Sequence, residues 1–346
     1  MGRRDKDKYR KSLHQQAYDW LLPMLKFGES KKNYIKECGN TDNAIFSRDT
    51  YNTYKKHIGY FLQWMKHEHP ECTSLKKAKY YTKDWLQYRT DYVNEKGEHL
   101  SAWTIQIEAK AINKLFGIHQ GDELYFEPPI RKNSEIKRSR HIVEKDKHFS
   151  EAKNEEFINF CKGVGSRKDA LSKLKAENLW SRDEMELEIN DSACYEVKDN
   201  KVIKDIIDAL KTFPDQNFFV HYKKDKGGRS RFAPIIGKNK NEIIERMINT
   251  SPDRKVWEYI PRNADVHSFR GDYAVAIYKH YARDVKNISK DEYIYINGKK
   301  KSAIYVCRGD QAGRKYDRVA LIKCSKALGH NREDVVVNNY LRGVAI

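Results

Sequence analysis

The C-terminal stretch of the sequence contains residue types that could act on a phosphodiester. His330 follows Gly329, and Tyr340 comes after a run of valines, in a segment that reads ALGHNREDVVVNNYLR. A tyrosine hydroxyl can attack phosphorus when fixed cations stabilise the charge that develops on the phosphate oxygens and other groups move the protons. A valine-rich helix whose tyrosine merely packs on the protein would contain the same residues. The assignment of Tyr340 as a nucleophile therefore requires catalytic partners elsewhere in the chain.

Four other basic residues could be those partners. His267 and Arg270 are three residues apart at the start of an expected helix, which places them on one face. Arg167 precedes a helix of leucine period, and Lys226 lies in the turn of an expected hairpin. Arginine suits a phosphate because its planar fork meets two oxygens at once and stays charged. Each of these signals alone is more often a surface pair, a helix cap or a solvated turn. The functional interpretation therefore depends on their order along the chain.

This order of Arg, Lys, HxxR, Gly-His and Tyr resembles the tyrosine recombinase (phage integrase) family. The first block is degenerate, the hairpin block is fairly specific, and the last two blocks are specific. The resemblance covers roughly residues 51–342. The four matching blocks are Gly165, Arg167, Leu171 and Leu174; Lys226, Gly227, Arg231 and Pro234; His267 and Arg270; and Leu328, Gly329, His330 and Tyr340.

The resemblance implies a role for each catalytic residue, with the tyrosine as nucleophile. Arg167 and Arg270 would hold the phosphate oxygens, and Lys226 would give a proton to the leaving 5′-oxygen. His267 would accept the tyrosine proton, and His330 would contact the scissile phosphate. The product would be a 3′-phosphotyrosyl link with a free 5′-hydroxyl. Because that link preserves the bond energy, religation would need no ATP, metal or other cofactor.

The sequence departs from the family pattern near the first and the last of the matched catalytic residues. An acidic residue usually stands three places after the first arginine, where this chain has Ala170, with Asp169 one place early. The spacing from His330 to the tyrosine is one residue longer than in most relatives. Asn339 therefore occupies the usual tyrosine place, but an amide cannot be the nucleophile, so we assign Tyr340. Segments at about 180–215 and 284–315 look like insertions.

The elements expected to position these residues differ between the two halves of the chain. From about residue 49 to 117, apolar residues recur at helical spacing, Ser101 is a good N-cap and Gly117 a plausible stop. The second half adds strands: residues 217–224 and 229–236 flank the turn sequence DKGG, and residues 291–296 and 302–307 flank NGKKK. Both pairs are typical of hairpins.

We therefore predict a multidomain fold. An all-α, SAM-like core-binding domain would precede a mainly α, mixed α/β catalytic domain with small β-hairpins. The core-binding domain would span residues 46–127, after an N-terminal extension, 1–45, of unassigned role. A basic linker, 128–148, would follow the DNA backbone while joining the two domains, and the catalytic domain would span 149–346.

The composition indicates a polyanionic partner. The 346 residues carry a net charge of +18, with a pI near 9.4, which is typical of chains that bind nucleic acid. No long apolar run or lipidation signal supports a membrane. The basic N-terminus lacks the apolar core of a secretory leader. Six cysteines without a CxxC pair argue against a zinc ribbon or a disulfide scaffold. We expect a cytoplasmic protein.

The function expected from the resemblance is that of an integrase or transposase of a mobile element. Its partner would be double-stranded DNA with inverted-repeat core sites, bound as a homotetramer, with or without an accessory DNA-bending factor. A type IB topoisomerase is an alternative, but such enzymes typically carry lysine where this chain has His267. A non-catalytic DNA-binding protein on the same scaffold is another, and it would be expected to have lost part of the basic set or the tyrosine.

Overall fold

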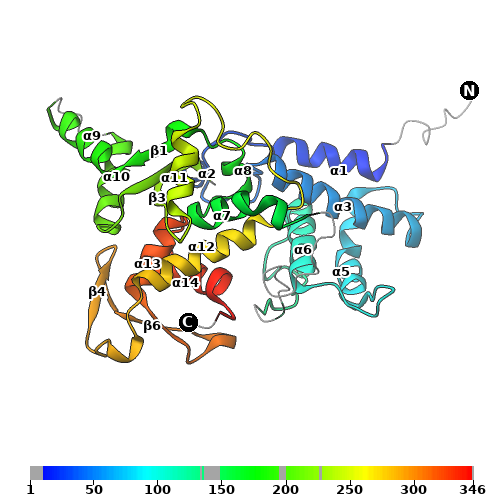
Figure 1. The fold of residues 1–346 in the computed structure, drawn as a ribbon. Helices are drawn as coiled ribbons and strands as arrows, with labels where there is room; N and C mark the ends of the chain where they lie inside the picture. The colour runs from blue at the N-terminus through cyan, green and yellow to red at the C-terminus, as the bar shows by residue number, and fades with distance from the viewer. Residues whose placement is uncertain (1–10, 133–134, 136–148, 195–199, 226–227, 345–346) are drawn as a thin grey trace, which may run out of the picture. The chain divides into compact units, whose positions relative to one another are not determined.

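The structure is a computed structural model that describes residues 11–132, 135, 149–194, 200–225 and 228–344 (Figure 1). The chain divides into two compact units, Met1–Glu135 and Ile136–Ile346. Most of the predicted linker lies outside the described residues, so the linker and the domain boundaries stay predictions. No helix among the residues that the structure describes is long and apolar enough to cross a membrane.

The first unit is built from helices in the part that the structure describes. The longest, α3, packs against α6, and together they supply half of the buried apolar residues in the core of this unit. The helices are α1 (Leu13–Leu21), α2 (Lys31–Cys38), α3 (Arg48–Glu68), α4 (Leu75–Ala78), α5 (Thr82–Asp91) and α6 (Ala102–Phe116).

The sequence patterns predicted the two long helices of this unit well. In α3, Ile58, Phe61, Leu62 and Met65 are buried, as a stripe of helical period requires. In α6, the Ser101 hydroxyl accepts the backbone N–H of Thr104 at 3.2 Å. Gly117 ends that helix with a positive φ of 58°. These contacts satisfy the end groups that a helix leaves unpaired.

The second unit is mainly helical and carries small antiparallel sheets, which confirms the predicted mixed α/β class at this level. Its helices are α7 (Glu155–Val164), α8 (Lys168–Leu171), α9 (Arg182–Cys194), α10 (Lys201–Thr212), α11 (Lys240–Ile248), α12 (Val266–Tyr281), α13 (Arg318–Ala327) and α14 (Glu333–Val336), followed by a π-helix, Val337–Leu341. Its strands are β1 (Leu179–Ser181), β2 (Phe218–Asp225), β3 (Arg229–Pro234), β4 (Tyr293–Ile296), β5 (Lys299–Ser302), β6 (Ile304–Val306) and β7 (Lys315–Asp317).

Of the two predicted hairpins, the first is confirmed and the second is wrong in its pairing. Strands β2 and β3 pair as expected, with β1 on the other edge of β2. Strand β4 pairs with β5, which begins at Lys299, so the connection is the two-residue turn Asn297–Gly298 and not the longer NGKKK loop. The segment 302–307 instead supplies β6, which pairs with β7.

Helix α12 is the centre of the second unit and positions the candidate site. It packs against α7 on one side and α13 on another (Figure 1). The buried hydroxyl of Tyr273 donates to the carbonyl of Pro234 at 2.8 Å. Its ring lies against Gly165, where a Cβ atom would approach a ring carbon to 2.1 Å. Gly165 therefore allows the end of α7, and the loop that follows it, to approach α12 closely.

Candidate active site

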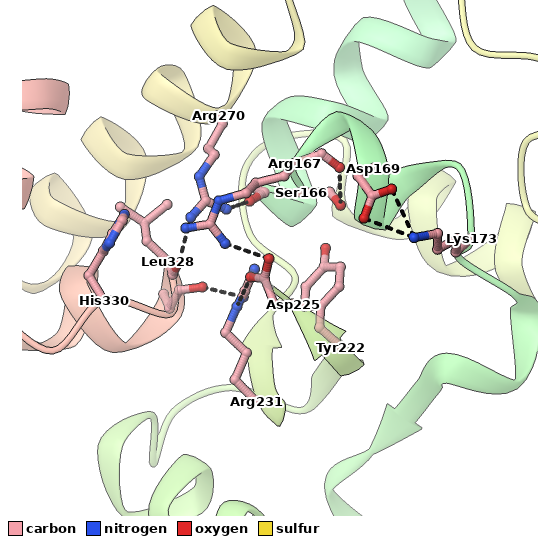
Figure 2. Close-up of polar contacts among 12 residues, drawn as sticks. Ser166, Arg167, Asp169, Lys173, Tyr222, Asp225, Arg231, Arg270, Leu328 and His330 are labelled. Atoms are coloured by element: carbon pink, nitrogen blue, oxygen red, sulfur yellow. Dashed lines mark hydrogen bonds and ion pairs between the residues drawn. The ribbon is translucent and has the colours of Figure 1, made fainter. Parts of the chain in front are cut away.

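Arg270 lies at the centre of the site, on the second turn of α12, and its side chain is almost completely buried, at 1% exposure. Its two terminal nitrogens donate to the backbone carbonyls of Gly165 and Leu328 (Figure 2). Its Nε donates to the Tyr340 hydroxyl at 3.2 Å. The guanidinium is thus fixed by two loops from distant parts of the chain. A cation held this way needs no reorganisation to meet a phosphate.

His267 is one turn before Arg270 on the same helix. The Asp265 carboxylate caps the start of α12 by accepting the backbone N–H of Ser268 at 2.9 Å. The three-residue spacing puts both side chains on one face, as the sequence predicted. The His267 ring centroid is 5.7 Å from that of Tyr340, so the HxxR pair and the tyrosine meet in space.

Tyr340 lies in the π-helix and is 5% exposed. Its hydroxyl is 3.3 Å from Nε2 of His330, and the two rings are 5.7 Å apart at their centroids. Asn339, by contrast, is exposed, and its amide donates to the carbonyl of Val335 at 3.0 Å. Of the two neighbouring residues, the tyrosine therefore faces the site and the asparagine faces outward.

The environment of His330 keeps its imidazole neutral. Burial, together with the charges of Arg270, Arg167 and Arg231, lowers the pKa of His330 to about 4, from an ordinary value of 6.5. Desolvation and nearby cations both disfavour the imidazolium form. A neutral imidazole whose nitrogen lies beside a tyrosine hydroxyl can accept its proton.

Arg167 is supported by a carboxylate that the sequence did not point to. It immediately precedes α8, and its Nη1 donates to Asp225, at the end of β2 (Figure 2). Asp169, the acid nearest to the expected place, instead pairs with Lys173 at 2.8 Å, with 79% of its side chain exposed. The acidic partner of Arg167 thus comes from the hairpin and not from the helix that follows the arginine.

Asp225 also binds a second arginine. Its other oxygen accepts from Nε of Arg231 at 3.0 Å, and Arg231 donates in turn to the carbonyl of Ala327. The Arg231 guanidinium lies 4.1 Å from the ring centroid of Tyr222. Burial lowers the pKa of Arg231, and the Asp225 carboxylate opposes that shift. One buried carboxylate therefore compensates two cations, and this network connects the hairpin to the Gly-His loop.

The Gly-His loop leaves no room for a side chain beside this network. Gly329 has a positive φ of 68°, and a Cβ atom there would lie 2.8 Å from both Cδ and Nε of Arg231. A small cavity, about 190 Å³, opens beside the loop. Its lining includes Ser230, Arg231 and His330.

The structure brings together five of the six residues that the sequence singled out. Arg167, His267, Arg270, His330 and Tyr340 surround one centre, while Lys226 lies outside the described residues. Asp225 and Arg231 were missed as members of the charge network. Arg231 stood in a matched motif without a role. The signal for Asp225 was its place directly before Lys226, because the end of a strand that carries one site residue is a natural position for another.

The comparisons with known proteins are sparse. No profile of a known protein family matches the sequence, and no curated protein matches it either. Among solved structures, a XerA recombinase matches with 12% identity over 94% of this chain and 93% of the other, at a TM-score of 0.23. A likeness of that degree does not establish a shared fold, so the function is argued from the chemistry of the site.

Proposed function

We propose that this chain is a site-specific DNA recombinase of the tyrosine type, which cleaves and rejoins DNA strands through a 3′-phosphotyrosyl intermediate. One observation carries the proposal: the Tyr340 hydroxyl lies 3.2 Å from a buried guanidinium nitrogen and 3.3 Å from the nitrogen of a neutral imidazole. A hydroxyl that must lose its proton and attack an anion needs both neighbours.

The proposed cleavage step balances within the protein and the DNA. The Tyr340 oxygen bonds to phosphorus as the bond between phosphorus and the 5′-oxygen breaks. The phenolic proton passes to an imidazole, and the rings of both His330 and His267 lie beside the tyrosine. The leaving 5′-oxygen takes a proton, for which the family resemblance suggests Lys226. Religation is the same step in reverse, with a 5′-hydroxyl as the attacking group.

The two site arginines would bind the non-bridging oxygens of the scissile phosphate. Arg270 is held by two carbonyls and Arg167 by Asp225, so both cations are positioned before DNA arrives. Preorganised donors of this kind each contribute about two to three decades in rate. Among the described residues, the carboxylate that contacts the site arginines is Asp225, and its two ion pairs make it a poor ligand for Mg²⁺.

The partner would be double-stranded DNA, in keeping with the net charge of +18. Both units would contact the duplex, and four protomers would assemble across two sites. Binding should weaken steeply with salt, since log affinity falls by about 0.9 for each phosphate neutralised. Footprinting that detected contacts from the second unit alone would remove the first unit from this account.

A nicked suicide substrate tests the proposal. It would carry the inverted repeats found in the DNA that flanks the gene, and its short cleaved strand diffuses away, which traps the covalent intermediate. In EDTA, the wild-type protein should give a shifted band on a denaturing gel. Tyr340→Phe should bind the DNA without forming that band, because it lacks only the attacking oxygen.

Tyr316→Phe is the matched control, because it also removes a hydroxyl from a buried ring of the same unit. It should form the covalent band normally. A band that persisted in Tyr340→Phe would assign the nucleophile to another tyrosine, and an absolute Mg²⁺ requirement would overturn the mechanism. DNA binding without any covalent band in the wild type would favour a non-catalytic binding protein. Relaxation of supercoiled DNA without dependence on a site would favour a topoisomerase.

A further inference from the structure

The β4–β5 hairpin lies in the segment at 284–315, to which the proposed chemistry gives no role. Its strands are joined by Asn297 and Gly298, with positive φ values of 49° and 74°. Two consecutive left-handed residues are the mark of the tight turn that matches the twist of a hairpin. In Figure 1 this two-stranded ribbon projects from the helices of its unit.

One face of this ribbon presents aromatic and cationic groups to solvent. Tyr293 and Tyr295 alternate along β4 on the same face and are exposed, Tyr295 to 75%. Lys300 pairs with Tyr295 across the strands, and its ammonium lies 4.1 Å from the ring centroid of Tyr293. Lys299 alternates with Lys300 and so starts from the opposite face, but it is exposed beside the turn. Both rings remain exposed to solvent, so burial among the described residues does not account for this face.

The opposite face anchors the ribbon to the segment that leads to the nucleophile. Lys301 donates to the Glu333 carboxylate at 3.2 Å, and Arg318 donates to the same oxygen at 2.8 Å. Glu333 is the first residue of α14, which runs directly into the π-helix that carries Tyr340. The exposed face of the hairpin is therefore presented from a fixed base beside the candidate site.

The chemistry of this face fits a nucleic acid better than another protein strand. Residues 293–302 contain three lysines and no carboxylate, and two of these lysines are exposed: Lys300 on this face and Lys299 beside the turn. Lysines along an edge strand oppose pairing with a further strand, whereas they attract phosphates. The major groove of DNA admits a two-stranded ribbon, and tyrosine hydroxyls are common donors to the sugar–phosphate backbone.

We propose that the β4–β5 hairpin is a second DNA-contacting element, which binds backbone phosphates of the duplex that flanks the cleaved bond. Lys299 and Lys300 supply the charge, and Tyr293 and Tyr295 supply flat surfaces and hydroxyl donors. This inference rests on the proposed function, since it requires that DNA is the substrate. It goes beyond that function by assigning a role to a segment outside the catalytic set.

The test measures how the affinity of the full chain for a long mixed-sequence duplex depends on salt. The variant Lys299→Ala with Lys300→Ala should bind more weakly at low salt. If both lysines contact phosphates, the slope of log affinity against log salt should be shallower by about 1.8, twice the contribution of one phosphate. The control, Lys153→Ala with Lys238→Ala, removes the same charge from two exposed sites outside the hairpin.

A second pair of variants tests the aromatic contribution without any change in charge. Tyr295→Ser should weaken binding several-fold, whereas Tyr259→Ser should not, although Tyr259 is exposed to a similar extent, 71%.

Equal salt slopes for the double-lysine hairpin variant and the wild type would overturn the proposal. Equal losses in the hairpin and control variants would also overturn it, because they would reflect overall charge alone.

Two further readouts separate this inference from its alternatives. If the wild type forms the covalent band but the hairpin variant keeps the wild-type salt slope, only the hairpin proposal fails. If the wild type does not bind DNA at all, the proposed function fails with it. A hairpin variant that kept full DNA affinity but lost self-association in sedimentation would assign this face to a second copy of the chain, and so would overturn the DNA contact.

Discussion

Nε of Arg270 donates a hydrogen bond to the hydroxyl of Tyr340, although the two residues are 70 positions apart in the chain. The other two nitrogens of this guanidinium are held by backbone carbonyls. In the proposed mechanism, one arginine therefore touches both the attacking atom and the phosphate that it attacks. Alignment of two reacting groups by a single rigid side chain lowers the entropic part of the barrier.

Arg270→Lys should separate charge from geometry. Lysine keeps the positive charge but lacks the planar fork that reaches Tyr340 and both carbonyls. We expect the rate of covalent attachment to fall by about two to three decades while DNA binding persists. Single-turnover cleavage of the suicide substrate measures the rate, and a melting curve checks that the buried site still folds. A rate near that of the wild type would mean that charge alone suffices.

Asp225→Asn should damage the site far more than Asp169→Asn. Removal of the Asp225 charge leaves two cations without their shared partner, and breaking a buried ion pair costs about 3–5 kcal/mol. Asp169 is exposed and, among the contacts described, its carboxylate pairs only with Lys173 in the turn after α8, so its loss should cost less than about 1 kcal/mol. Thermal unfolding and the covalent assay should both rank the variants in this order. The reverse order would indicate that Asp169, and not Asp225, is the carboxylate that supports Arg167.

Gly329→Ala tests the close approach of the Gly-His loop to Arg231. Gly309 is the matched control, because its φ of 66° is nearly that of Gly329 but nothing lies within 4 Å of a Cβ atom there. Alanine at either site should cost about 1–2 kcal/mol of unfolding free energy, because the left-handed backbone conformation disfavours a Cβ atom. Gly329→Ala should lose about 1–3 kcal/mol more, because its methyl group displaces Arg231. Calorimetric unfolding that gave equal losses would show that Arg231 moves freely.

The sequence predicted the parts of the site that depend on local chemistry and on order. The HxxR pair could be predicted from the start of a single helix, which Asp265 caps. The pairing of β2 with β3 could be predicted from two apolar runs around a turn. The support of Arg167 could not be predicted in the same way. Asp225 lies 58 residues away, and only the folded chain brings the end of β2 to the start of α8.

The pairing of β4 was predicted wrongly for a local reason. The segment 302–307 has the apolar character of a strand, whereas lysine is a poor strand former, so the lysines of NGKKK read as a loop. The Asn-Gly turn decided the register instead, because two left-handed residues fix the strand that follows. Lys299–Ser302 therefore became the partner of β4 despite its composition.

The pKa of His330 gives a prediction that does not depend on catalysis. In the free protein it should titrate near pH 4, because burial and three arginines oppose its charged form. Since the folded-state value lies below the ordinary 6.5, the unfolded chain binds the proton first as the pH falls. This residue should therefore reduce stability between about pH 6.5 and 4 and have no such effect above that range.

Bound DNA should move that titration upward, because a phosphate anion favours the imidazolium. Nuclear magnetic resonance of the histidine side chains, with Tyr340→Phe to prevent cleavage, measures the shift. His221 is an internal control: burial lowers its pKa to about 4 as well, but its ring stacks on Phe232 at 4.2 Å in the sheet. DNA that shifted both histidines equally, or neither, would contradict a phosphate beside His330.

The last prediction concerns the π-helix, which under the proposed function accommodates the residue by which the spacing from His330 to Tyr340 exceeds that of the resembling family. A π turn contains more residues than an α turn and is frequent at functional sites. Here it leaves Asn339 exposed and Tyr340 buried in the site. Exchanging the two, as Asn339→Tyr with Tyr340→Asn, should abolish the covalent band, because the new tyrosine would face solvent. Deleting Asn339 should instead retain some attachment, because the turn can close to α geometry with the tyrosine one position nearer to His330. The denaturing gel distinguishes the two variants directly. An active exchange variant together with an inactive deletion would show that a tyrosine at position 339 can reach the site, and therefore that the π-helix does not select the nucleophile.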